Sequence, residues 1–172
     1  MQVSLSLLEE IGACEDARSW FYSEFGLRSV WVVDALEKCK EDMWIVWFAA
    51  AMEHKLYQSG HFQSLAVNII AEIVEERYQI EVQRATEDNV VNVLNELDEA
   101  VSKMPPGGLL TYSVVQSLDF LMDASSPEDE DTPPSAVYAT SIYNALVHMH
   151  RFKDASKIMF NFAVEWLTGD EQ

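Results

Sequence analysis

Apolar residues recur at helical spacing along almost the whole chain. The clearest example is the set Val90, Leu94, Leu97, Val101 and Met104. These positions step by four, three, four and three residues, which puts them on one face of an amphipathic helix. No stretch alternates with a period of two for long enough to indicate a sheet. The pattern therefore predicts an all-α fold.

Capping residues and helix breakers divide this pattern into about eight to nine short helices. Thr86 stands at a typical N-cap position, and the Pro-Pro-Gly-Gly run at 105–108 ends the same helix. We expect helices near residues 3–10, 14–25, 30–39, 42–57, 62–81, 87–104, 109–123, 136–151 and 154–167. A chain of 172 residues can bury one substantial core. We therefore expect a single-domain helical bundle over residues 1–172.

One segment departs from the helical pattern by its composition. Residues 125–135 read Ser-Ser-Pro-Glu-Asp-Glu-Asp-Thr-Pro-Pro-Ser, without an aliphatic or aromatic side chain. Because such a segment has nothing to bury, we expect an acidic mobile loop. Its simplest role is to keep the surface solvated. The sharper alternative is a strip of carboxylates that meets Lys and Arg side chains on a partner.

The negative charge of the chain is concentrated in its middle. The chain has 29 acidic and 11 basic residues, a formal charge of −18, and residues 85–150 contribute −10 through eleven acidic residues and one lysine. Such a field attracts basic surfaces and repels nucleic acid and anionic membranes. We therefore expect a basic protein as the partner, with no direct contact to nucleic acid or membrane. The expected partner-binding residues are Glu87, Asp88, Glu96, Glu99, Asp119, Asp123, Glu128, Asp129, Glu130 and Asp131.

Signatures of catalysis and of cofactor binding are absent from the sequence. It has no Gly-rich phosphate loop, no His-Glu-x-x-His and no Gly-x-Ser-x-Gly, so we expect no enzyme, no cofactor and no metal site. The sequence nominates no further zinc ligands beside its histidines, which are His54, His61, His148 and His150. A third-ranked alternative is a magnesium-dependent enzyme built from helical carboxylates. Its candidate ligands are Glu72, Glu75, Glu76, Glu96 and Glu99.

Cysteine usage and the apolar runs indicate the compartment. Only Cys14 and Cys39 occur, which is no disulfide scaffold. The first residues lack the basic segment of a signal peptide, and no run reaches the roughly 20 apolar residues that cross a bilayer. We therefore expect a cytoplasmic protein with two reduced thiols.

Four of the five tryptophans, Trp20, Trp31, Trp44 and Trp47, lie within 28 residues of one another. The favoured interpretation is a tightly packed aromatic core. The alternative is a binding groove lined by indole rings, because aromatic anchors dominate the hot spots of protein interfaces.

Two N-terminal elements resemble a known group of proteins. The first is residues 8–21, with Gly-Ala-Cys at 12–14 and Trp-Phe at 20–21, and the second is Asp-Met-Trp-Ile-Val-Trp-Phe at 42–48. Together they resemble the opening of small helical phage and bacterial proteins described as immunity proteins, although Met43 is an extra residue and the middle of the chain departs from that group. The resemblance implies a cytosolic, phage- or bacterium-encoded helical protein that binds another protein. It implies no catalytic residues.

These observations favour a non-enzymatic acidic interaction protein. We expect it to bind and inhibit a basic nucleic-acid-binding protein, such as a nuclease, a toxin, or a defence or transcription complex, by imitating the charge of nucleic acid. The alternative is a helical adaptor or scaffold that binds through an aromatic surface and uses its acidity only for solubility. A homodimer belongs to that alternative.

Overall fold

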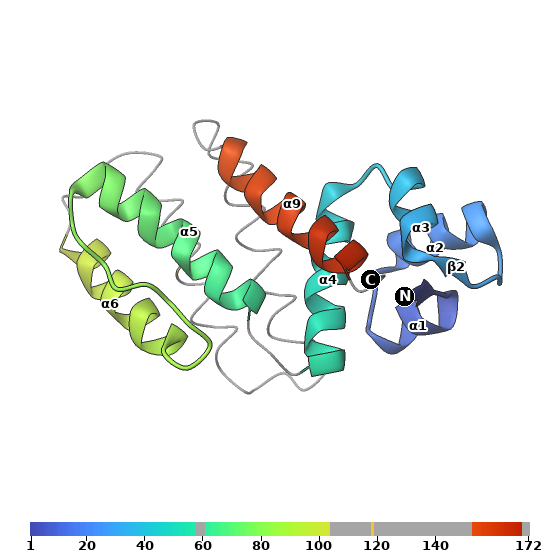
Figure 1. The fold of residues 1–172 in the computed structure, drawn as a ribbon, viewed down its shortest axis with the longest axis horizontal. Helices are drawn as coiled ribbons and strands as arrows, with labels where there is room; N and C mark the ends of the chain where they lie inside the picture. The colour runs from blue at the N-terminus through green and yellow to red at the C-terminus, as the bar shows by residue number, and fades with distance from the viewer. Residues whose placement is uncertain (58–60, 104–117, 119–152, 170–172) are drawn as a thin grey trace.

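The structure, a computed structural model, describes residues 1–57, 61–103, 118 and 153–169 (Figure 1). Within them lie seven α-helices, where eight to nine were expected for the whole chain, and the all-α class is confirmed. The helices are α1 (Leu5–Glu10), α2 (Glu15–Phe25), α3 (Val32–Lys38), α4 (Asp42–Tyr57), α5 (His61–Tyr78), α6 (Val90–Ser102) and α9 (Lys153–Gly169). The helices expected near 109–123 and 136–151, and the acidic loop expected at 125–135, lie outside the described residues.

The helices are arranged in an elongated body with three parts. Figure 1 shows α1, α2 and α3 at one end, α5 and α6 at the other, and α4 and α9 between them. Helix α9 packs along α4 and also contacts α3 and α5. No helix in the described part of the chain combines the length and the apolar character that a bilayer span would need.

A small antiparallel sheet at the N-terminal end corrects the prediction that strands are absent. Strand β1 (Gln2–Val3) pairs with β2 (Val30–Trp31), so that Val3 lies opposite Val30. The backbone N–H of Val32 also donates to the carbonyl of Met1 at 3.0 Å. Two residues per strand are too few for a visible alternation of apolar and polar positions, so the pattern gave no signal.

The centre of the core is formed where α4 meets α9. Three consecutive alanines of α4, Ala49, Ala50 and Ala51, are fully buried. Because side chains this small let helix axes approach closely, α9 can lie directly against α4. From α9, Met159, Ala163 and Leu167 are fully buried at spacings of four residues, which is one helical face. The C-terminal helix is therefore an integral part of the core.

Helix α6 confirms the face that the sequence predicted. Its buried side chains are Val90, Val93, Leu94, Leu97 and Val101. Four of these five are the predicted positions, and the fifth widens the same stripe. They pack against α5, whose Ile70 and Val74 are fully buried. Met104, the last residue of the predicted face, lies outside the described residues.

The segment between α5 and α6 is longer than the sequence indicated. Helix α5 ends at Tyr78, three residues early, because Gln79 adopts a left-handed conformation (φ 55°). Helix α6 begins at Val90, three residues late. The carboxamide oxygen of Asn89 accepts hydrogen bonds from the backbone N–H and the hydroxyl of Thr86, so a turn replaces the predicted first helical turn. Asn68 of α5 holds this segment through hydrogen bonds to both backbone groups of Ala85, at 3.0 and 2.7 Å.

Candidate functional site

The expected partner-binding carboxylates fall into two groups. Glu87 and Asp88 lie in the turn before α6, Glu96 and Glu99 lie on α6, and all four are exposed. The other expected residues lie outside the described residues; they are Asp119, Asp123, Glu128, Asp129, Glu130 and Asp131. The structure therefore brings four of the ten to one end of the molecule.

Two of these four carboxylates have partners within the chain, which the sequence did not predict. Glu87 lies 2.8 Å from Nε2 of His61. Glu99 accepts a hydrogen bond of 2.6 Å from Lys103, one helical turn later. That hydrogen bond and the positive charge of Lys103 lower the pKa of Glu99. Both glutamates stay exposed, but each offers less uncompensated charge than expected.

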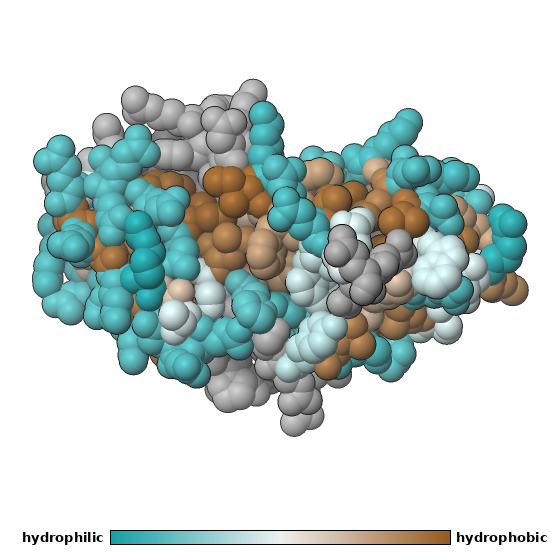
Figure 2. Space-filling model, viewed as in Figure 1, coloured by the Kyte–Doolittle hydropathy of each residue, from teal (hydrophilic) through white to brown (hydrophobic). Residues whose placement is uncertain are grey.

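The remaining acidic residues of this end form what we call the acidic α5–α6 surface. It consists of exposed carboxylates that form no ion pair with a described lysine or arginine: Glu72, Glu76, Glu81, Asp88, Glu96 and Asp98. Of the basic residues nearby, Arg84 binds Glu75 at 2.9 Å. Figure 2 shows hydrophilic side chains over this end of the molecule.

A buried carboxylate joins α4 to α5 beside this surface. Glu53 of α4 is fully buried, and its Oε1 lies 2.7 Å from Nδ1 of His61. Its Oε2 accepts a hydrogen bond of 3.2 Å from the backbone N–H of Phe62. A carboxylate at this place satisfies a helix N-terminal donor and lies at the positive end of the dipole of α5. Because His61 also contacts Glu87, one imidazole ring connects α4, α5 and the turn before α6.

The opposite end of the molecule contains an apolar cavity of about 350 Å³. Its walls come from β1, α1, α2, α3 and α4, together with the short segment between α1 and α2. If it were closed and empty, a cavity of this volume would cost on the order of 8 kcal/mol. That cost rivals the roughly 5–15 kcal/mol by which whole domains are stable. The space is instead open to the surface, and its size lies in the range of roughly 300–1,000 Å³ that is typical of small-molecule sites.

The cavity is open because four small residues converge on it from different elements. They are Gly12, Ala13, Ala17 and Ala35. Around them stand large rings, which are Trp20, Phe21, Trp44, Trp47 and Phe48. The three tryptophans are half-buried and Trp31 is 51% exposed. The expected aromatic core is therefore confirmed in part. The phenylalanines Phe21, Phe25 and Phe48 are buried and Trp20 and Trp47 pack against the core, whereas the prediction is wrong for the exposed Trp31.

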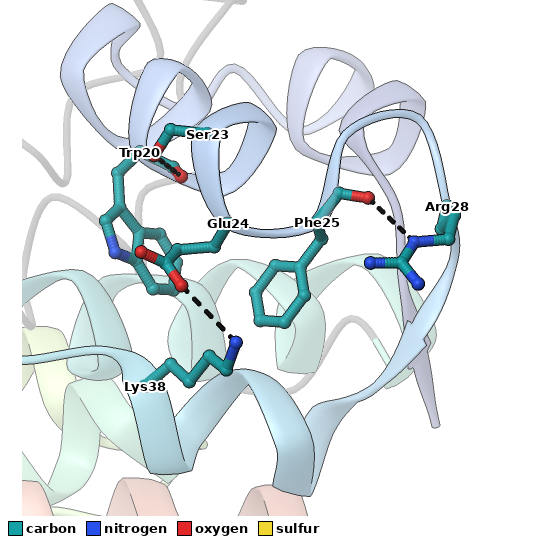
Figure 3. A network of polar contacts seen from close by, with 6 residues as sticks. All are labelled: Trp20, Ser23, Glu24, Phe25, Arg28 and Lys38. Atoms are coloured by element: carbon teal, nitrogen blue, oxygen red, sulfur yellow. Dashed lines mark hydrogen bonds and ion pairs between the residues drawn. The ribbon is translucent and has the colours of Figure 1, made fainter.

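Contacts between α2 and α3 hold one wall of the cavity (Figure 3). Trp20 packs edge-on against Phe25, with ring centroids 6.1 Å apart, and contacts Trp44 at 5.9 Å. Lys38 of α3 lies 3.4 Å from the carboxylate of Glu24 and 5.1 Å from the ring centre of Phe25. These contacts join α2 to α3 and α4 around the ring of Trp20.

Both cysteines of the chain line this cavity. Cys14 is exposed at the start of α2, and Cys39 is half-buried after α3. Burial raises the pKa of the Cys39 thiol, a hydrogen bond with the backbone of Glu41 lowers it, and the nearby carboxylates of Glu41 and Asp42 raise it further. Cys39 is therefore a thiol at neutral pH, and that end of the cavity experiences a negative potential.

The described residues offer no group of three His, Cys, Asp or Glu side chains that could hold a metal ion. Comparison of the chain with protein-family models, with curated proteins and with solved structures gave no match. The resemblance to immunity proteins and the absence of an enzymatic activity thus remain predictions. The arguments about function depend on the acidic α5–α6 surface and the cavity.

Proposed function

We propose that the chain is a non-enzymatic interaction protein that binds and inhibits a basic protein through its acidic α5–α6 surface. The target class is a nucleic-acid-binding protein or complex, whose cationic site the carboxylates occupy in place of phosphates. The observation that carries the proposal is the set of six exposed carboxylates without a basic partner among the described residues. Four of the six lie on α5 and α6, and the buried faces of these helices belong to one continuous core.

The packing of α6 supports this proposal further. Its apolar face packs against α5, and Glu96 and Asp98, which flank that face on opposite sides, stay exposed to the solvent. Of the basic side chains that the structure describes on α5, α6 and their connection, Arg84 is engaged by Glu75, and Lys103, directly after α6, is engaged by Glu99. The surface keeps a net negative potential, which accelerates the association of a positively charged partner.

A charge-reversal variant tests this proposal. Lysine replaces Glu72, Glu96 and Asp98 together, and the tagged protein is used to capture partners from lysate of the cells that encode it. We expect the captured basic protein to bind this variant at least about tenfold more weakly than the wild type, because the attraction becomes repulsion. Raising the salt concentration from roughly 50 to 500 mM should release it from the wild type, since surface charges are screened over a few ångströms at high salt.

The matched control carries the same change of net charge elsewhere. Glu9, Glu37 and Glu165 are exposed on α1, α3 and α9, outside the acidic α5–α6 surface, and form no described ion pair. Their triple lysine variant should capture the partner almost as well as the wild type. Equal losses in both variants, or a partner without a basic surface, would contradict the proposal.

A second candidate function is a helical adaptor that binds through an aromatic surface. The observation that favours it is the exposure of Trp31 (51%) at the β2 edge of the N-terminal end. For this adaptor, Trp31→Ala should abolish partner capture and leave the free energy of unfolding within about 1 kcal/mol of the wild type. Urea denaturation followed by circular dichroism measures the second quantity. Unchanged capture would eliminate the adaptor.

A further inference from the structure

The apolar cavity at the N-terminal end lies apart from the acidic α5–α6 surface, and the proposed function makes no use of it. Its walls belong to β1, α1, α2, α3 and α4, whereas the acidic surface lies on α5, α6 and their connection. The two features can therefore be tested separately. A failure of either proposal leaves the other standing.

We propose that this cavity is a binding site for a small, uncharged, ring-containing apolar molecule. The size of the cavity, about 350 Å³, is that of a small-molecule site. None of the described side chains that line it carries a charge. Three indole and two benzene rings stand in the wall, and such rings prefer edge-to-face or offset contacts with a further ring.

The surroundings of the cavity argue against an anionic ligand. The carboxylates of Glu41 and Asp42 act electrostatically on the thiol of Cys39, which lines the cavity. A ligand with a carboxylate, sulfonate or phosphate at this end would meet two like charges. It would also leave water without gaining a charged partner in the lining, and an unpaired buried charge is costly. A neutral ring system therefore fits this lining better than a fatty acid or a nucleotide.

Small residues in the lining of the cavity leave room for a ligand. Ala17 projects from α2 and Ala35 from α3 into the lining, and neither is fully buried. A larger side chain at either position would occupy the ligand's place. These two positions therefore allow the cavity to be filled without altering the acidic α5–α6 surface.

A pair of fluorescent probes with the same ring skeleton tests the proposal. N-phenyl-1-naphthylamine is uncharged, and 8-anilino-1-naphthalenesulfonate adds one sulfonate to it. We expect the uncharged probe to bind the full-length protein with a dissociation constant on the order of 10 µM. Energy transfer from Trp20, Trp44 and Trp47, which line the cavity, should quench their emission as the probe brightens. The sulfonated probe should bind at least about tenfold more weakly.

Two substitutions in α2 show where the uncharged probe binds. Ala17→Phe fills the cavity and should abolish binding of the uncharged probe. Ser19→Phe adds the same ring two residues away, at an exposed position that does not line the cavity, and should bind like the wild type. If Ala17→Phe does not fold, Ala35→Leu takes its place.

The rate of Cys39 alkylation reports binding of the probe in the wild-type protein. Because Cys39 lines the cavity, the bound probe should slow its alkylation by N-ethylmaleimide in proportion to the occupied fraction. The proposal is overturned if no saturable binding occurs, if the two phenylalanine variants bind equally, or if the sulfonated probe binds as tightly as the uncharged one. Displacement of the probe by a captured protein partner would also overturn it, because the cavity would then receive a side chain of that partner.

Discussion

Replacing Phe62 with alanine is expected to lower the free energy of unfolding by about 3–5 kcal/mol. Phe62 is fully buried at the start of α5. Its ring meets two rings of α9 edge-on, Phe162 at 4.9 Å and Trp166 at 6.4 Å between centroids. Truncation therefore leaves a cavity between α5 and α9 and removes both aromatic contacts.

Urea denaturation followed by circular dichroism measures this loss, with the midpoint and slope fitted separately. Phe62→Leu keeps most of the volume and loses only the ring geometry, so it should cost about 1.5 kcal/mol or less. Tyr22→Ala is the control, because it removes an aromatic ring that is 56% exposed, and it should cost about 1 kcal/mol or less. Similar losses for Phe62→Ala and Tyr22→Ala would show that α5 and α9 are not packed through this ring.

The amphipathic helices were the part of the fold that the sequence made predictable. Helix α6 has one apolar stripe and one polar face, so its core residues could be identified from spacing alone. Its first turn was predicted wrongly, because Thr86 looked like an N-cap. In the structure, the side chain of Asn89 binds Thr86 instead. Two good capping residues three positions apart compete, and tertiary contacts decide between them.

Helix α4 shows why the spacing of apolar residues cannot assign a buried face when a helix is apolar on every side. From Ile45 to Met52 only Trp47 is not buried, so the pattern contains no face that could be assigned to a neighbour. One side of this helix packs on α9 and another lines the cavity. That division depends on long-range packing, which a local pattern does not contain.

The candidate sites were predictable only in part, for physical reasons. Composition located the acidic end of the molecule, and the tryptophan cluster located the N-terminal end. The sequence offered a groove lined by indole rings only as the alternative to an aromatic core. It could not place the small residues of the cavity, because Gly12, Ala17 and Ala35 belong to different segments and only the fold brings them together. The pairing of Glu87 with His61 was missed for the same reason, since 26 residues separate them in the sequence.

The second large effect is expected at Glu53, the buried carboxylate of α4. We expect Glu53→Ala to lower the free energy of unfolding by about 2–3 kcal/mol. The backbone N–H of Phe62 would lose its acceptor, and the N-terminus of α5 would lose a negative charge at its positive end. His61 would also lose the contact at 2.7 Å that ties it to α4. Because the His61 side chain is 59% exposed, water can replace that contact, so most of the loss comes from Phe62.

Two variants separate the hydrogen bond of Glu53 from its charge. Glu53→Gln keeps an oxygen that can accept from Phe62, so we expect it to cost less than Glu53→Ala. Glu76→Ala removes an exposed carboxylate of α5 and should stay within about 0.5 kcal/mol of the wild type. Hydrogen exchange provides a local readout, since the amide of Phe62 should exchange faster in Glu53→Ala than in Glu53→Gln.

A free energy of unfolding that is not lowered in Glu53→Ala would be equally informative. A carboxylate that is fully removed from water carries a desolvation cost, and that cost can exceed the gain from its contacts. Here the carboxylate accepts from one backbone donor and lies beside one imidazole. We expect these contacts to prevail, because the donor is itself buried and nothing else in the described chain would satisfy it. A Glu53→Ala protein as stable as the wild type would show instead that desolvation dominates at the joint between α4 and α5.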